Sequence, residues 1–330
     1  MQLNYSEELI LDDILKTCTR LFGFRVVESV PIKRGWLNLK WKVTTDFGIF
    51  LIKQYNKKRL KRYNHSELLF AFSQQIRLNN EGLPSPKLMS HKGNSMFESD
   101  NGEFFIVMDY CEGEIIPPGK LNAEQMFDLG KVTGKMHQIL NDKTLGEDRV
   151  PQFILPSREV RLEHWKSVQK KVIESNKLHL LPVIDSQYIT TEAVDFLDFN
   201  VVETGWAHRD LWVDNLLFKG NQVSAVLDFD RLKYDYPQLD VARAVISGCL
   251  NERNTFNANL ASAFVAGYRE NCSFEQRNLV KSLRLLWYME STWWVDENMD
   301  QHVGPPTRFS KEMIWLSKNY GELDSIAEND

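Results

Sequence analysis

The spacing of hydrophobic and polar positions changes about one third of the way along the chain. In the first 110 residues, apolar side chains fall in short runs that are typical of partly buried strands. Beyond residue 121, apolar residues recur every three or four positions over longer runs, as on one face of a helix. This change predicts an α+β protein, with a small antiparallel-sheet part followed by a larger, mainly helical part.

The predicted N-terminal lobe, residues 1–110, is an antiparallel sheet with one helix inserted after its third strand. A capped helix precedes the sheet, over residues 6–23. A tight turn that ends at Gly48 joins the second and third strands. The inserted helix, residues 66–80, stops before a turn rich in Gly and Pro. Strand patterns occur at residues 24–32, 39–45, 48–55 and 103–110, with a further short one before residue 99.

A Gly- and Pro-rich segment at residues 111–121 predicts a connector to the C-terminal lobe, residues 122–330. Helical patterns dominate this lobe. They occur at residues 122–141, 158–176, 185–200, 238–250, 255–271, 274–295 and 310–320. One interruption, at residues 205–232, combines a polar loop with two short strands around Gly220.

Composition excludes several classes of protein. The chain has 330 residues, 43% of them hydrophobic and 26% charged, which is enough for two lobes with their own cores. A net charge of -5 argues against a nucleic-acid partner. The four cysteines lack CxxC spacing, so neither a zinc site nor a disulfide framework is expected. Without a signal-peptide pattern or a long apolar run, we expect a cytoplasmic protein with no membrane partner; its oligomeric state stays open.

The interruption at residues 205–232 carries the candidate chemistry. Its loop reads AHRDLWVDN, with Asp210 and Asn215 five positions apart, and LDFD follows, with Asp228 at the end of the strand pair. Carboxylate and amide oxygens suit Mg²⁺ bound together with phosphate, so Asn215 and Asp228 are predicted metal ligands. Asp210 would then accept the proton of a hydroxyl nucleophile. This division of roles is typical of phosphoryl transfer.

Phosphoryl transfer also requires a cation on the phosphates, and Lys53 is the candidate. It lies inside the apolar strand pattern FLIKQY, where a lysine is costly unless it is paired. Glu67, at the start of the next helix, is the predicted partner, although a first-turn glutamate also suits the helix dipole by itself. Asp230 has two open interpretations, a second carboxylate at the metal or a surface residue.

Together, HRDLWVDN, LDFD, the strand lysine and the helix glutamate resemble the signature of the protein-kinase-like superfamily. More narrowly, the chain resembles its small-molecule branch: aminoglycoside phosphotransferases, choline kinases, type II homoserine kinases and spore-coat kinase-like proteins. YDYPQLDVARAV resembles the helix start that follows the metal aspartate in this branch, and GLPSPKL resembles its turn after the glutamate helix. The resemblance covers about residues 25–270 and implies a bilobal protein-kinase-like fold.

The resemblance implies ATP and Mg²⁺ as cofactors and a role for each matching residue. These are the base Asp210, the metal ligands Asn215 and Asp228, the phosphate-binding Lys53 and its partner Glu67. The backbone around Asp109 and Cys111 would hydrogen-bond adenine, with Met108 behind the ring. His208 would orient the loop.

Three positions need comment beside this resemblance. The phosphate-covering loop has a single glycine, Gly35, and Asn38 stands where small-molecule kinases often have a polar residue, which implies a looser cover. Arg209 stands where this branch usually has glycine. Asp240 precedes an apolar helix pattern and is predicted to be its N-cap, and in the family this position also steadies the catalytic loop.

A cluster near the C-terminus is a candidate substrate site. Trp287, Glu290, Trp294 and Glu297 fall at spacings of three and four, on one face of a predicted helix. Aromatic rings with carboxylates suit an amine or a quaternary ammonium group. The alternative is an ordinary aromatic core helix.

These observations predict an ATP-dependent phosphotransferase that acts on a hydroxyl of a small molecule. The acceptor stays open among aminoglycosides, amino alcohols, homoserine and sugars, as does the choice between ATP and GTP. The main alternative is a kinase-fold protein with a structural or binding role, as in the spore-coat relatives, and a protein kinase is a weaker one. The retained Asp210, Asn215, Asp228 and Lys53 favour an enzyme.

Overall fold

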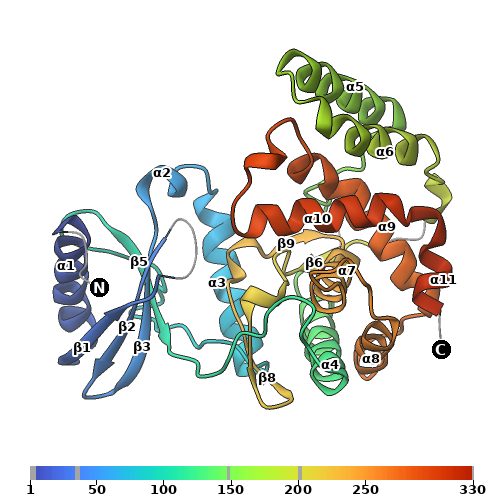
Figure 1. The fold of residues 1–330 in the computed structure, drawn as a ribbon. Helices are drawn as coiled ribbons and strands as arrows, with labels where there is room; N and C mark the ends of the chain where they lie inside the picture. The colour runs from blue at the N-terminus through green and yellow to red at the C-terminus, as the bar shows by residue number, and fades with distance from the viewer. Residues whose placement is uncertain (1–4, 34–37, 147–148, 200–202, 329–330) are drawn as a thin grey trace. The chain divides into compact units, whose positions relative to one another are not determined.

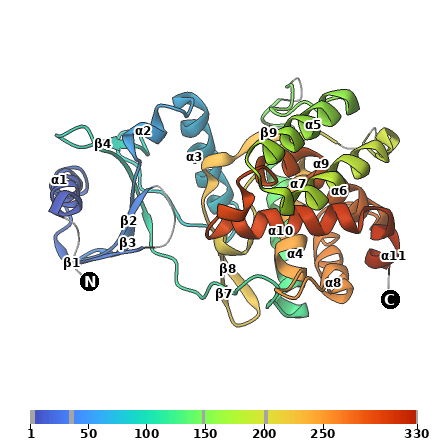
Figure 2. The same ribbon diagram turned by 45° about the horizontal axis from the view of Figure 1, so that its top comes forward.

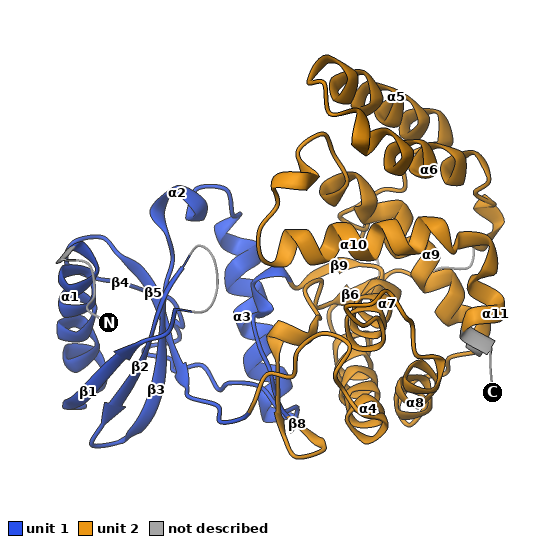
Figure 3. Cartoon of the chain, in the orientation of Figure 1, with its two compact units in different colours: residues 1–113, 224–231 blue, residues 114–223, 232–330 orange. Residues whose placement is uncertain are grey.

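The computed structural model describes residues 5–33, 38–146, 149–199 and 203–328. The chain forms two compact units (Figure 3). Unit 1 consists of residues 1–113 and 224–231, and unit 2 of residues 114–223 and 232–330. The sequence placed residues 224–231 in the C-terminal lobe, but their contacts group them with unit 1. In this segment the amide of Val226 donates to the carbonyl of Pro84 (2.8 Å), and the Ser224 hydroxyl donates to the carbonyl of Glu112 (2.9 Å).

Unit 1 contains the antiparallel sheet that the sequence predicts. Its strands are β1 (Val26–Pro31), β2 (Leu39–Thr45), β3 (Gly48–Gln54), β4 (Phe97–Glu98) and β5 (Phe104–Asp109). Their order in the sheet is β1-β2-β3-β5-β4. Thr45 pairs with Gly48 at the predicted hairpin turn, where the positive φ of Gly48 (142°) explains the glycine. The α+β prediction is confirmed.

Helices cover the two faces of this sheet (Figures 1 and 2). Helix α1 (Tyr5–Phe22) packs on one face, and α3 (His65–Asn80) on the other. The α1 face is formed by Leu11, Ile14 and Cys18 against Trp41, Val43, Phe50 and Ile52. The α3 face is formed by Leu68 and Phe72 against Tyr55, Ile106 and Met108. A short helix that the sequence did not predict, α2 (Lys57–Leu60), lies in the basic run and is capped by Asn56.

The alternation of side chains along β3 puts its lysine on the α3 face. Phe50 and Ile52 belong to the α1 core, so Leu51 and Lys53 point to the opposite side. In the β2–β3 register, Lys40 is paired with Lys53. Residues that are directly opposite in an antiparallel pair share a face. Lys40 and Lys53 are therefore neighbours on the α3 face.

Unit 2 is mainly helical, as the sequence predicts. Its helices are α4 (Ala123–Leu140), α5 (Arg158–Glu174), α6 (Leu181–Glu192), α7 (Pro237–Cys249), α8 (Ala258–Tyr268), α9 (Gln276–Trp294), α10 (Pro305–Lys318) and α11 (Leu323–Glu328). Helix α7 is the centre of the core, since every residue from Leu239 to Cys249 is buried. Helices α4 and α8 pack side by side (Figures 1 and 2). Their close approach requires glycine, because a Cβ at Gly130 or Gly267 would overlap a backbone carbonyl of the other helix.

Two predictions for unit 2 were incomplete. The helix expected at residues 185–200 is α6, which begins with a proline in its first turn and ends at Glu192, and a 3-10 turn (Phe196–Asp198) follows. The short strands β6 (Gly205–Ala207) and β9 (Lys233–Asp235), which pair antiparallel, were not predicted. The expected hairpin strands are β7 (Leu216–Lys219) and β8 (Gln222–Val226). None of the helices in the described ranges is both long and apolar enough to cross a membrane.

Candidate functional site

In unit 1, the central feature is a buried lysine with two carboxylate partners. Lys53 is 4% exposed, and its Nζ lies 2.9 Å from Asp228 Oδ1 and 2.6 Å from Asp230 Oδ2. Burial alone would lower the pKa of Lys53, but Asp228 and Asp230 outweigh it and raise the pKa, so the side chain stays charged. The strand thus holds a permanent cation, as the sequence predicts, with its partners on the segment 224–231.

Asp230 is held by Lys53 and by a residue that the sequence did not single out. It is 7% exposed, so its interpretation as a surface residue was wrong. The hydroxyl of Tyr55 donates to Asp230 Oδ1 at 2.9 Å, while Oδ2 contacts Lys53. Burial raises the pKa of Asp230, against the opposing effects of Lys53 and Tyr55. Glu67, the expected partner of Lys53, lies exposed in the first turn of α3, and its pairing with Lys53 stays a prediction.

A second cation, Lys40, lies across from Lys53 and was missed. Lys40 is partly buried on β2 and directly opposite Lys53 in register. Burial lowers the pKa of Lys40, an effect that Asp228 opposes and the nearby Lys53 reinforces. The run LKWK shows two lysines, Lys40 and Lys42, but only the strand register reveals that Lys40 is the one directly opposite Lys53.

The remaining predicted nucleotide contacts lie around the same sheet. Asn38 Oδ1 accepts a hydrogen bond from the amide of Asn56 (3.2 Å), which ties the start of β2 to the cap of α2. Met108 is buried on β5, in register with Leu51. The amide of Asp109 is already engaged by the carbonyl of Lys87 (2.9 Å). An adenine contact near Asp109 and Cys111 would therefore use other backbone groups of this segment. Gly35 lies outside the described residues.

In unit 2, Asp210 and Asn215 lie together on the loop between β6 and β7. The amide nitrogen of Asn215 donates to the backbone carbonyl of Asp210 (2.8 Å) and to its carboxylate Oδ2 (3.0 Å). Both residues are partly buried. This contact orients the Asp210 carboxylate and directs the amide oxygen of Asn215 away from it. The structure thus holds together the two polar loop residues that the sequence singled out.

The loop is anchored by Asp240 on α7. The Asp240 carboxylate accepts hydrogen bonds from the amides of His208 (2.6 Å) and Arg209 (2.7 Å), and it contacts His137 Nε2 (3.0 Å). Burial would raise the pKa of Asp240, but these groups outweigh it and lower the pKa. The prediction that Asp240 is the N-cap of α7 was wrong, because the N-cap is Tyr236.

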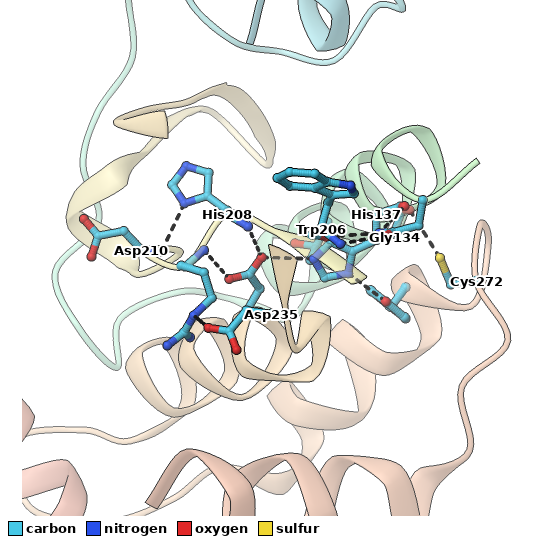
Figure 4. A network of polar contacts seen from close by, with 12 residues as sticks. Gly134, His137, Trp206, His208, Asp210, Asp235 and Cys272 are labelled. Atoms are coloured by element: carbon cyan, nitrogen blue, oxygen red, sulfur yellow. Dashed lines mark hydrogen bonds and ion pairs between the residues drawn. The ribbon is translucent and has the colours of Figure 1, made fainter. Parts of the chain in front are cut away.

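Two imidazoles complete this network (Figure 4). His208 is fully buried, and its Nδ1 lies 3.2 Å from the amide of Asp210. His137 Nδ1 lies 2.8 Å from the hydroxyl of Tyr268, all within unit 2. His208 therefore accepts a hydrogen bond from the backbone just after Arg209, and His137 contacts the Asp240 carboxylate that binds the amides of His208 and Arg209.

Arg209 adopts a backbone conformation that favours glycine. Its φ is +64°, in the left-handed region, which costs a non-glycine residue about 1–2 kcal/mol. This explains why glycine suits the position, as expected from the resemblance. Its guanidinium pairs with Asp235 (2.7 Å) and with Glu290 (3.5 Å). Burial raises the pKa of Asp235 to about 6, although Arg209 opposes this effect.

The predicted substrate cluster is not one helix face. Trp287 is buried in the core and donates from Nε1 to Gln187 (2.7 Å). Glu290 is buried and pairs with Arg243 and Arg209. Helix α9 ends at Trp294, which packs on Phe309 with ring centroids 4.7 Å apart. Glu297 therefore lies beyond the helix, 3.5 Å from Lys171. Periodicity alone does not distinguish a core helix from one that lines a site.

Comparison with known proteins places the chain among phosphate-transferring enzymes. The model of the phosphotransferase enzyme family matches residues 28–272, more than half of the chain. A homoserine kinase of Zymomonas mobilis subsp. mobilis is 24% identical over 305 residues, which cover 88% of this chain and 89% of that protein. Two solved structures share the fold: a spectinomycin phosphotransferase with ADP and spectinomycin (TM-score 0.59, 12% identity, 96% and 97% covered) and a microcompartment-associated aminopropanol kinase (TM-score 0.59, 14% identity, 96% and 98% covered).

Proposed function

The chain belongs to the phosphotransferase enzyme family, and we propose that it transfers the γ-phosphate of ATP to the hydroxyl group of a small amino alcohol or hydroxy amino acid. L-Homoserine is the first candidate acceptor, because the relative named homoserine kinase aligns with 88% of this chain. The observation that carries the proposal is the loop in which Asn215 orients Asp210 and Asp240 holds the backbone.

Residues of unit 1 would hold the nucleotide. Lys53 and Lys40 supply two cations on one face of the sheet, which suits phosphate oxygens. The spectinomycin phosphotransferase binds ADP, which supports an adenine nucleotide. Met108 and the backbone near Asp109 and Cys111 remain the proposed adenine contacts. An enzyme that consumes ATP is expected in the cytoplasm, and this location is part of the proposal.

The residues present fit Mg²⁺. The Asp228 side chain is 32% exposed, whereas that of Asp230 is 7% exposed and uses both oxygens on Lys53 and Tyr55. Asp228 is therefore the carboxylate that suits a cation. Asn215 binds Asp210 through its amide nitrogen, so its oxygen is the atom for a metal. Bound Mg²⁺ would neutralise phosphate charge.

Asp210 would orient the acceptor hydroxyl and take up its proton. The hydrogen bond from Asn215 at 3.0 Å fixes the carboxylate, and the amides that Asp240 binds fix the backbone just before it. Catalysis would then rest on positioning and on charge neutralisation, because the transition state of phosphoryl transfer is loose.

An acceptor panel tests this proposal. ADP release is measured with L-homoserine, 1-amino-2-propanol, choline, an aminoglycoside and spectinomycin, for the parent and for Asp210→Asn. We expect one amino alcohol or hydroxy amino acid to stimulate the parent, and Asp210→Asn to lose about 10²- to 10⁴-fold in kcat with ATP binding retained. If no acceptor raised ADP release above that of the Asp210→Asn protein, the proposal would be wrong.

A further inference from the structure

The residue before the proposed base is held in an unusual conformation by side chains from separate elements. Arg209 has a φ of +64°, a region that residues other than glycine rarely adopt. Its side chain is 6% exposed, so the guanidinium is part of the interior of unit 2. Such a conformation persists only where the surrounding structure enforces it.

Two carboxylates form ion pairs with the Arg209 guanidinium. Nε donates to Asp235 Oδ2 on β9 at 2.7 Å, and Nη1 lies 3.5 Å from Glu290 Oε1 on α9. Asp235 is fully buried, and Glu290 is 6% exposed. The guanidinium also lies over the ring of Phe153, 5.5 Å from its centroid. Arg209 is thus fixed from three sides.

The ion pairs of Arg209 extend into the helical core as a network in which arginines and carboxylates alternate. Glu290 also pairs with Arg243 on α7, Arg243 pairs with Glu312 on α10 (2.6 Å), and Glu312 pairs with Arg308 (2.7 Å). The members are three arginines, Arg209, Arg243 and Arg308, and three carboxylates, Asp235, Glu290 and Glu312. Because the charges balance, loss of the first arginine leaves a buried carboxylate without compensation.

We propose that Arg209 is a positioning residue for Asp210: the ion pairs with Asp235 and Glu290 select the left-handed backbone at Arg209 and thereby set the direction of the Asp210 carboxylate. Glycine at this position permits the left-handed conformation but also populates negative φ freely. In this chain the anchored Arg209 side chain selects the left-handed conformation. The proposal rests on the proposed function, because it assigns Arg209 a role in the same reaction.

The test compares Arg209→Gly with the parent in steady-state kinetics. We expect kcat to fall about 10- to 100-fold, the loss that follows when a reacting group is misplaced by about 1 Å, while KM for ATP stays within about 2-fold. Guanidinium chloride at a few millimolar should raise the melting temperature of Arg209→Gly without restoring kcat, because a free ion can compensate the charges of Asp235 and Glu290 but cannot constrain the backbone at residue 209. Urea at the same concentration should change neither quantity, and neither solute should raise the kcat of the parent.

Two further variants keep the test decisive. Arg284→Ala is a matched control, because Arg284 also pairs with two carboxylates, Asp198 (2.9 Å) and Asp324 (2.6 Å), outside the loop. It should lower the melting temperature and leave kcat unchanged. If Arg209→Gly does not fold, Asp235→Leu removes one of the two carboxylates and should lower kcat with KM for ATP unchanged.

The outcomes separate the two claims. Turnover by the parent tests the proposed function alone, and without it the role of Arg209 falls as well. If the parent is active and Arg209→Gly, or Asp235→Leu in its place, has the same kcat, the positioning role is wrong while the proposed function stands. A fall in kcat that guanidinium reverses in folded Arg209→Gly would also overturn the role, because charge compensation without a tethered side chain would then be enough.

Discussion

Replacing Asp230 with asparagine separates the structural role of this carboxylate from ATP binding. Asp230 and Lys53 are 7% and 4% exposed and lie 2.6 Å apart. Breaking a buried ion pair by removing one partner costs about 3–5 kcal/mol. Asp228 remains 2.9 Å from Lys53, and asparagine keeps an oxygen near Tyr55, so we expect about 2–3 kcal/mol for Asp230→Asn.

The charges near the proposed phosphate site predict that Asp230→Asn strengthens nucleotide binding although it lowers the stability of the fold. Lys40 and Lys53 face Asp228 and Asp230, so the four charges cancel. Asp230→Asn leaves one positive charge uncompensated, which favours the phosphates of ATP. The variant should therefore unfold more easily, yet saturating ATP with Mg²⁺ should raise its melting temperature more than that of the parent.

The assay is thermal unfolding with and without ATP and Mg²⁺. At about 2–4 °C per kcal/mol, the variant should melt roughly 5–10 °C below the parent. Asp100→Asn is the matched control, because Asp100 pairs with Arg20 on the surface (2.8 Å) and should leave the melting temperature unchanged. A variant Asp230→Asn that melts within about 1 °C of the parent would refute the argument from burial.

Two further predictions follow from the two sites. Lys40→Met should raise KM for ATP about 3- to 10-fold without lowering the melting temperature, because it removes a phosphate contact together with a cation whose pKa burial already lowers; an unchanged KM in an ATP titration would count against Lys40. For Asp235, burial raises the pKa to about 6 from the ordinary 3.8, so its charge destabilises the folded state above pH 6, and this effect disappears as the pH falls toward 4. As the pH falls over this range, protonation of Asp235 weakens its contact with Arg209, so kcat should fall. Melting temperatures measured across pH 4–7 should show the parent becoming more stable relative to Asp235→Asn as the pH falls. Asp240 also faces Asp235, but its pKa is lowered, so it stays charged there.

Elements with a strong local pattern were predictable. Strands β2 and β3 follow from apolar alternation around the turn at Gly48, and α3 ends before the Gly- and Pro-rich turn that marks its limit. The strands β6 and β9 were missed because three residues are too few to show a period. The prediction for α6 began too late in the chain. It followed the periodicity at residues 185–200 and overlooked Pro182, which fixes the first turn of the helix.

For the candidate site, the sequence identifies individual residues but not the contacts between them. Asp210, Asn215 and Lys53 are recognisable because their chemistry contrasts with the neighbouring apolar strand residues. The ion pairs between such residues cannot be recognised from the sequence, because they join distant parts of the chain. Lys53 and Asp230, for example, are 177 positions apart. Likewise, the sequence left Glu290 open between a substrate contact and a core residue, because its partners Arg209 and Arg243 lie on other elements.

The order in which the ribosome delivers the chain has a consequence for unit 1. The first 113 residues supply the whole sheet, but the carboxylates that neutralise its buried lysine arrive only with residues 228 and 230. A fragment that stops at residue 113 lacks both carboxylates that hold the Lys53 ammonium in unit 1. Unit 1 therefore cannot reach its final stability until more than two thirds of the protein has been synthesised.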